Sequence, residues 1–189
     1  MDNNCKIGNK AEKLLFLKKE GFNVPDLFVL PKHLSEKEVL KNCDENQIYA
    51  VRSSCISEDS KSKSFAGYFY SEIGVSYKNI YKAYQKVISS FKNEEGVVII
   101  QEFIPSDKSG VIFTNDGSSN MVINSNFGVC KTVVEGWECD ELLVSKKGII
   151  LNKEYPKIKE SLIWKDKKLI KNKENQFSLN SKEINQLIE

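Results

Sequence analysis

The amino-acid sequence predicts an α+β fold in which mostly antiparallel sheets are flanked by helices. The first observation is the helical spacing of apolar residues in two segments of the N-terminal half. The second is a series of short β-branched runs in the C-terminal half, separated by turn residues, which is typical of antiparallel strands. The chain has 189 residues, 40% hydrophobic and 29% charged, a balance that favours a globular protein over a disordered one.

Three elements are predicted in the first 45 residues. Residues 9–20 favour an amphipathic helix, because alanine and leucines recur there at helical spacing and Gly21 follows as a stop signal. A short apolar stretch bracketed by prolines favours a strand at 27–30. A second helix is expected after Ser35, since Glu38 stands three residues later as the partner of a capping box.

The chain from residue 48 to residue 91 alternates between strands, a loop and a helix. Residues 48–52 favour a strand, which leads into a polar run at 53–64 that we expect to be a loop. Another strand is predicted at 69–75. Residues 77–91 carry apolar side chains on one helical face and predict a third helix.

Predicted strands dominate the second half of the chain. Residues 97–104 and 110–114 look like two strands joined by a turn. Four further short strands are expected at 121–125, 131–136, 141–145 and 148–152. From residue 153 the chain is rich in lysine and poor in aromatic residues, and a last helix begins within 178–189.

The charge balance argues against nucleic-acid and membrane partners. Lys and Arg total 28 against 26 for Asp and Glu, so the formal net charge is only +2. Acidic residues interrupt the lysine-rich segment 153–173, which favours a solvated surface over a nucleic-acid site. No apolar run reaches the roughly 18 residues that span a bilayer, and the first residues lack the apolar core of a signal peptide. We therefore expect a cytoplasmic protein.

The cysteine and histidine content argues against disulfides, zinc sites and histidine-dependent catalysis. Five cysteines, an odd number without a Cys-x-x-Cys pair, favour reduced thiols over a disulfide framework. The single histidine, His33, lies in a polar stretch expected to be a loop, so neither a zinc site nor a hydrolase with a histidine base is favoured. We assign no metal ligand and no catalytic residue within the chain.

Five motifs in a fixed order carry a family resemblance. They are Ile7-Gly-Asn-Lys-Ala-Glu-Lys-Leu, Asn23-Val-Pro-Asp-Leu-Phe-Val-Leu, Val51-Arg-Ser-Ser-Cys-Ile-Ser-Glu-Asp with Ser64-Phe-Ala-Gly, Ile100-Gln-Glu-Phe-Ile, and Ser109-Gly-Val-Ile-Phe-Thr. The set resembles the N-terminal ATP-binding region of the phosphoenolpyruvate synthase and pyruvate phosphate dikinase family, which includes rifampin phosphotransferases. The resemblance implies a partial ATP-grasp domain over residues 1–189, with a first lobe at 1–95 and an incomplete second lobe at 96–189.

The resemblance also implies a set of ATP-binding residues: Lys10, Arg52, Gly67, Ser71 and Gln101. Their chemistry is suitable, because a triphosphate needs fixed cations and arginine binds phosphate oxygens bidentately while lysine acts as a point charge. A glycine lets backbone N–H groups approach phosphate closely. Each residue also has an ordinary interpretation, such as a solvated lysine, a structural ion-pair arginine or a turn glycine.

Two departures from the family pattern concern residues 128–140. The chain reads Gly128-Val-Cys-Lys131 before Val133-Val-Glu-Gly136, where the family usually has an acidic residue at the position of Lys131. It also reads Cys139-Asp140 where the family has Pro-Asp. The reversed charge is compatible with altered phosphate or partner binding and equally with a lost role, and the sequence leaves both open.

The resemblance implies a function that this chain shares with other segments. We expect the ATP-binding portion of a phosphoenolpyruvate synthase or pyruvate phosphate dikinase-like phosphotransferase, which holds ATP for phosphoryl transfer to a carrier histidine outside the chain. Mg²⁺ ligands, the rest of the ATP-grasp domain, and the phosphohistidine and acceptor domains are expected elsewhere, so the 189 residues alone should be inactive. The alternative is a non-catalytic nucleotide-binding or regulatory protein derived from that domain.

Overall fold

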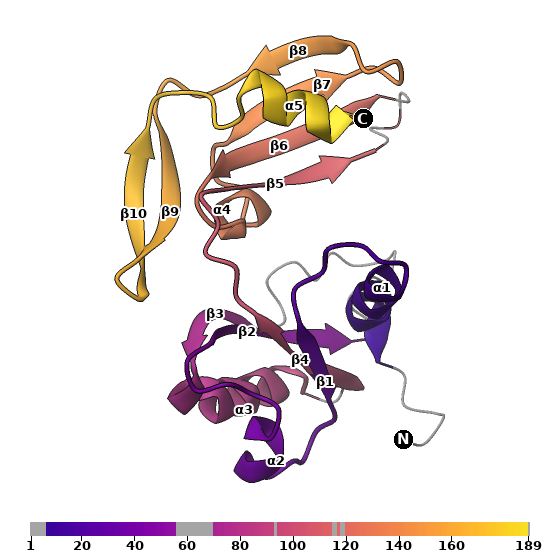
Figure 1. Ribbon diagram of the computed structural model, residues 1–189, viewed down its shortest axis with the longest axis vertical. Helices are drawn as coiled ribbons and strands as arrows, with labels where there is room; N and C mark the ends of the chain where they lie inside the picture. Colours follow the sequence, from indigo (N-terminus) through magenta and orange to yellow (C-terminus); the bar gives the residue numbers. More distant parts are fainter. Residues whose placement is uncertain (1–6, 56–69, 93, 115–116, 118–119, 189) are drawn as a thin grey trace. The chain divides into compact units, whose positions relative to one another are not determined.

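The computed structural model describes residues 7–55, 70–92, 94–114, 117 and 120–188 (Figure 1). Contacts within the chain divide it into unit 1, Met1–Phe103, and unit 2, Ile104–Glu189. The family resemblance implied a boundary between lobes after residue 95. The strand Gly96–Glu102 stays with unit 1 because it is hydrogen-bonded to two other strands of that unit.

Unit 1 is built on a four-stranded antiparallel sheet in the order β1-β4-β2-β3. Its strands are β1 (Leu27–Leu30), β2 (Ile48–Cys55), β3 (Ser71–Ser76) and β4 (Gly96–Glu102). The two central strands, β2 and β4, are almost entirely buried. Successive side chains of a strand point to opposite faces, so each central strand contributes to two separate layers of packing.

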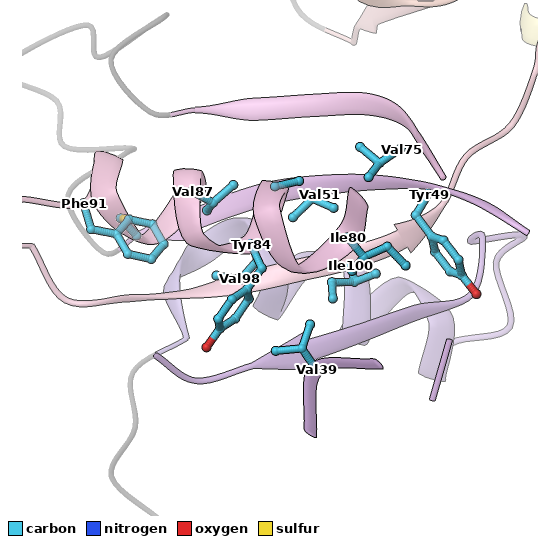
Figure 2. Packing of buried hydrophobic residues seen from close by; sticks show 12 residues of the cluster. Val39, Tyr49, Val51, Val75, Ile80, Tyr84, Val87, Phe91, Val98 and Ile100 are labelled. Carbon is cyan, nitrogen blue, oxygen red and sulfur yellow. The ribbon is translucent and has the colours of Figure 1, made fainter. Parts of the chain in front are cut away.

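Helices cover both faces of this sheet. On one face lie α2 (Glu36–Leu40), the 3₁₀ helix η2 (Tyr77–Asn79) and α3 (Ile80–Ser90), and on the other lies α1 (Gly8–Lys19) (Figure 1). Figure 2 shows the larger layer, in which Tyr84 and Val87 of α3 pack on Val51 and Ile100 of the sheet. The smaller layer joins Ala11 of α1 to the opposite face.

Unit 2 contains a second antiparallel sheet and a separate hairpin. The sheet has the order β5-β6-β7-β8, and its strands are β5 (Lys108–Phe113), β6 (Met121–Phe127), β7 (Asp140–Val144) and β8 (Ile150–Glu154). Helix α5 (Ser181–Ile188) packs on it through Ile184, which lies among Ile123, Leu142 and Val144. The hairpin consists of β9 (Lys159–Lys165) and β10 (Lys168–Glu174).

A buried ion pair holds the hairpin to the sheet. The side chains of Lys159 in β9 and Asp140 in β7 form this pair, and both are completely buried. Lys159 also donates to the carbonyl of Gln176 at 2.8 Å, and Asp140 accepts from the N–H of Ser178. The pair therefore joins β7, β9 and the segment that precedes α5.

A glycine allows the backbone of the hairpin to approach the end of β6. Gly128 has a φ of +73°, and a Cβ there would collide with the carbonyl group of Leu162. The next residue, Val129, donates its N–H to that same carbonyl oxygen at 2.8 Å. No side chain fits at position 128 while this contact exists.

The predicted α+β class with mostly antiparallel sheets is confirmed, and one predicted strand is wrong. Residues 131–136 form the short helix α4 (Lys131–Val134) and a turn. That prediction rested on β-branched residues, whose strand preference depends on context. Here β6 and β7 pair directly with each other, so the chain between them has no place in the sheet.

Three further predictions differ from the structure. The polar run 53–64 was expected to be a loop, but β2 continues to Cys55 because Ser53 and Ser54 are small enough to be fully buried in it. The strands at 97–104 and 110–114 belong to different sheets rather than to one hairpin. The lysine-rich segment after residue 153, for which no strand was predicted, contains β9 and β10.

Candidate functional site

The site predicted from the sequence is centred on β2 of unit 1. Arg52 lies in the middle of this strand, opposite Ile99 of β4 on one side and Ser71 of β3 on the other. Because directly opposed residues of antiparallel strands point to the same face, all three side chains share one face of the sheet.

The identity of that face follows from the alternation of β4. Val98 and Ile100 belong to the layer under α3, whereas Val97 and Ile99 belong to the layer that contains Ala11 of α1. Gln101 is two residues after Ile99, so it lies on the α1 face as well. The sheet therefore presents Arg52, Ser71 and Gln101 on the side where α1 begins.

Arg52 and Gln101 are in contact. Nη1 of Arg52 donates to Oε1 of Gln101 at 3.4 Å, across the neighbouring strands β2 and β4. Gln101 is only 7% exposed and Arg52 is half-buried. The guanidinium carries five N–H donors in a planar fork, and this geometry matches the oxygens of a phosphate or carboxylate.

Lys10 brings a second cation to the same strand. It lies in the first turn of α1, and its Nζ donates to the carbonyl oxygen of Ser53 at 3.0 Å. Ser53 directly follows Arg52 in the sequence, so the ammonium group of Lys10 in α1 contacts the backbone of β2 one residue after Arg52. Positively charged side chains that meet the same stretch of strand are suited to a ligand with several negative charges.

Ser71 is exposed at the start of β3, and its neighbour anchors this strand end. Glu72 lies on the opposite face, where its carboxylate accepts from Tyr70 Oη at 2.7 Å and from Lys86 Nζ of α3 at 3.0 Å. Burial acts to raise the pKa of Glu72, but the hydrogen bonds from Tyr70 and Lys86 outweigh it and lower that pKa. The contacts of Glu72 on the opposite face of the sheet thus anchor the end of β3 that carries the Ser71 hydroxyl.

Of the five residues predicted to bind ATP, the structure describes four. Lys10, Arg52, Ser71 and Gln101 gather around β2 on one face of unit 1. Gly67 and the motif Ser64-Phe-Ala-Gly lie outside the described residues.

The composition of the chain also distinguishes Arg52. Among the 28 basic residues, Arg52 is the only arginine, and every other basic residue is a lysine. Lysine satisfies a surface charge, but a planar fork of donors requires arginine. The composition alone therefore singles out the position that lies at the centre of this cluster.

The position of Lys131 in unit 2 is also described. Lys131 opens α4, and its Nζ lies 3.7 Å from Oε1 of Glu135 one helical turn later, with both side chains largely exposed.

Among the described residues, no group of three or more His, Cys, Asp or Glu side chains could hold a metal ion. No helix in the described part of the chain is long and apolar enough to cross a membrane.

A comparison with models of known protein families gives a match over most of the chain. A family model described as "Pyruvate phosphate dikinase, AMP/ATP-binding domain" matches residues 30–97 and 91–189. The match includes Arg52, Gly67, Ser71 and Gln101, whereas Lys10 precedes it. A search of curated proteins finds no significant match.

Proposed function

This chain belongs to the family of the pyruvate phosphate dikinase AMP/ATP-binding domain. From this membership we propose that the β2 cluster, which consists of Lys10, Arg52, Ser71 and Gln101, holds the phosphates of ATP for a dikinase-like phosphotransferase. The nucleotide-binding character comes from the family itself. The proposal adds which residues bind ATP and what the bound ATP is used for.

Each residue of the cluster has a role set by its chemistry. Arg52 binds phosphate oxygens through its planar fork, and Lys10 neutralises further phosphate charge as a mobile ammonium. Ser71 offers a hydroxyl donor, and Gln101 orients Arg52 and offers its amide to the nucleotide. Gly67 completes the set as a position where backbone N–H groups approach a phosphate.

The contact between Arg52 and Gln101 is the observation that carries this proposal. It places the only arginine of the chain on the face where α1 brings Lys10 to the same strand. An amide oxygen orients a guanidinium without adding a negative charge beside it, as a carboxylate would. The contact thus fixes the direction of Arg52 and is compatible with an anionic ligand on the same side chain.

The proposal extends to the reaction of the complete enzyme. We expect an ATP-grasp domain whose bound ATP gives up a phosphoryl group to a carrier histidine in another domain. Mg²⁺ supplies charge neutralisation in phosphoryl transfer when it is bound. Lys10 and Arg52 contribute the part of that neutralisation that comes from this chain.

A non-catalytic nucleotide-binding protein is the second candidate function. Lys131 favours it, because a basic residue stands where related sequences usually carry an acidic one, and it pairs with Glu135 on an exposed helix. This candidate predicts ATP binding by the β2 cluster but no phosphoryl transfer when the remaining domains of a related enzyme are supplied.

Isothermal titration with ATP tests the proposal. Arg52→Ala should lower the affinity for ATP about tenfold or more, because a hydrogen bond to a charged group is worth roughly 1.5–3 kcal/mol. The ATP affinity of Arg52→Lys should lie between those of the wild type and Arg52→Ala, since lysine keeps the positive charge but lacks the planar fork of donors. The control is Lys78→Ala in η2, which removes one exposed charge away from the cluster. Absence of ATP binding by the wild type, or an unchanged affinity in Arg52→Ala, would contradict the proposal.

A further inference from the structure

The hydroxyl of Ser54 joins β2 to the first turn of α1. Ser54 is completely buried, and its Oγ accepts the N–H of Ala11 at 3.0 Å and donates to the carbonyl oxygen of Ile7 at 2.7 Å. These two backbone groups are four residues apart, which is the spacing of a helical hydrogen bond. One side chain of the strand therefore binds both ends of the turn that contains Lys10.

The same junction is also held by a close backbone approach. Gly8 has a φ of +75°, and a Cβ on it would lie 2.8 Å from the carbonyl carbon and oxygen of Cys55 and 2.8 Å from Oγ of Ser54. Contacts of this length essentially exclude a side chain. The start of α1 thus lies directly against β2, and it has no room to move closer.

From this geometry we infer that Ser54 is a positioning residue for nucleotide binding, which sets the place of Lys10 relative to Arg52. Lys10 lies two residues after Gly8 and one before Ala11, inside the turn that Ser54 holds, and its Nζ reaches the carbonyl oxygen of Ser53. The inference rests on the function proposed above, because it concerns the distance between two cations that bind one polyphosphate.

The hydroxyl of Ser54 links the helix to the strand, and an apolar side chain of similar size cannot make this link. With alanine at position 54, Ile7 and Ala11 can satisfy each other within the helix, as in an ordinary first turn. The protein then keeps its backbone hydrogen bonds but loses the link between helix and strand. We therefore expect Ser54→Ala to fold and to hold Lys10 less firmly, which weakens binding of a ligand that needs both cations in place.

The test compares ATP affinities by isothermal titration. Ser54→Ala should bind ATP about tenfold more weakly than the wild type. The matched control is Ser161→Ala in β9, which removes another completely buried serine hydroxyl that has no hydrogen-bond partner in the described part of the chain. The control should bind ATP as the wild type does.

A double-mutant cycle separates positioning from general damage. If Ser54 acts through Lys10, adding Ser54→Ala to Lys10→Ala should change the affinity for ATP by less than about twofold. A merely structural role would lower the affinity about tenfold in both backgrounds and would overturn the inference. Ser54→Cys replaces the hydroxyl with a thiol, which is a weak hydrogen-bonding group. It should weaken ATP binding with the same dependence on Lys10, which decides the matter if Ser54→Ala does not fold.

The outcomes distinguish this inference from the function on which it rests. If Lys10→Ala and Arg52→Ala weaken ATP binding but Ser54→Ala and Ser54→Cys do not, the positioning role is wrong and the proposed function stands. If the wild type does not bind ATP, both are wrong. A selective loss in Ser54→Ala that disappears without Lys10 supports both.

Discussion

The guanidinium of Arg52 and the side-chain amide of Gln101 meet at 3.4 Å between Nη1 and Oε1, across neighbouring antiparallel strands. The partner of the guanidinium in this contact is neutral, so it orients the side chain without adding a negative charge. Arg52 is half-buried, and the surrounding protein screens charge there less than water does. A carboxylate in place of the Gln101 amide should therefore disturb ATP binding.

Gln101→Glu should weaken ATP binding about tenfold, because a carboxylate beside Arg52 would pair with the guanidinium and repel the phosphates. The measurement is isothermal titration at low and high salt, and the difference should be larger at low salt. Asn79→Asp adds the same charge to an exposed residue of unit 1 and should leave binding unchanged. Equal ATP affinities for Gln101→Glu and the wild type would count against the phosphate-binding role of Arg52.

The buried pair of Lys159 and Asp140 should be sensitive to the loss of one partner. Lys159→Met leaves the Asp140 carboxylate buried without its cation, which costs about 3–5 kcal/mol of unfolding free energy. Urea unfolding of the whole chain measures this cost. The double variant Lys159→Met, Asp140→Leu should recover part of it, because replacing a whole buried pair with apolar groups is far less costly than breaking it.

An exposed pair on the same hairpin provides the comparison. Lys171 lies 3.2 Å from the carboxylate of Glu160, with exposed fractions of 65% and 47%, so Lys171→Met should cost less than about 1 kcal/mol. If Lys159→Met were no more destabilising than Lys171→Met, the buried pair would not hold the hairpin as we describe.

The acid stability of unit 2 should depend on Glu183. Its carboxylate accepts from Lys108 Nζ at 2.8 Å and from the N–H of Asn180 at 2.7 Å, and these bonds lower the pKa of Glu183. A lowered pKa in the folded state adds stability above the unfolded value, and this stability is lost as pH falls through the folded value. Glu183→Gln should therefore be less stable than the wild type at neutral pH, and the difference should vanish well below about pH 4.

Urea midpoints at several pH values test this dependence. Glu138→Gln removes an exposed carboxylate of the same unit, for which the structure describes no ion pair, and it should show no such trend. A difference between Glu183→Gln and the wild type that grew as pH fell would reverse the expected sign.

Two thiols should react slowly with alkylating reagents. Burial raises the pKa of the Cys43 thiol, and burial together with the charges of Asp140 and Glu141 raises that of Cys139. Since the thiolate is the reactive form, alkylation at pH 8 should be slower at both than in the unfolded chain and should accelerate as pH rises. Site-resolved mass spectrometry after iodoacetamide treatment measures both rates. Equal alkylation rates in the folded and the unfolded protein would show that folding does not protect these two thiols.

Regular packing patterns were the most predictable part of this fold. The helix predicted at 77–91 is present as η2 and α3, because Ile80, Tyr84 and Val87 form one apolar face that must be buried against a sheet. The β9–β10 hairpin was missed because lysine is normally a surface residue, so a lysine-rich segment suggests a solvated surface. Lys159 is the exception that connects this segment to the core, and only the position of Asp140 in space reveals it.

The site was predictable in its residue types but not in its arrangement. The ordered motifs and the single arginine are enough to point to Arg52. The pairing of Arg52 with Ser71 depends on strand register, and the long polar run between β2 and β3 contains no signal that sets it. The role of Ser54 was missed for a related reason, since a serine in a motif says nothing about which distant backbone groups its hydroxyl reaches.

The contact of Gly128 with the carbonyl group of Leu162 has a consequence for how this sequence can vary. A residue with a side chain at position 128 is incompatible with the hairpin in its present place, whatever else changes nearby. Among natural variants we therefore expect glycine at this position to be inherited together with the hairpin. A relative that has lost the glycine should also show a changed or deleted segment around 159–174.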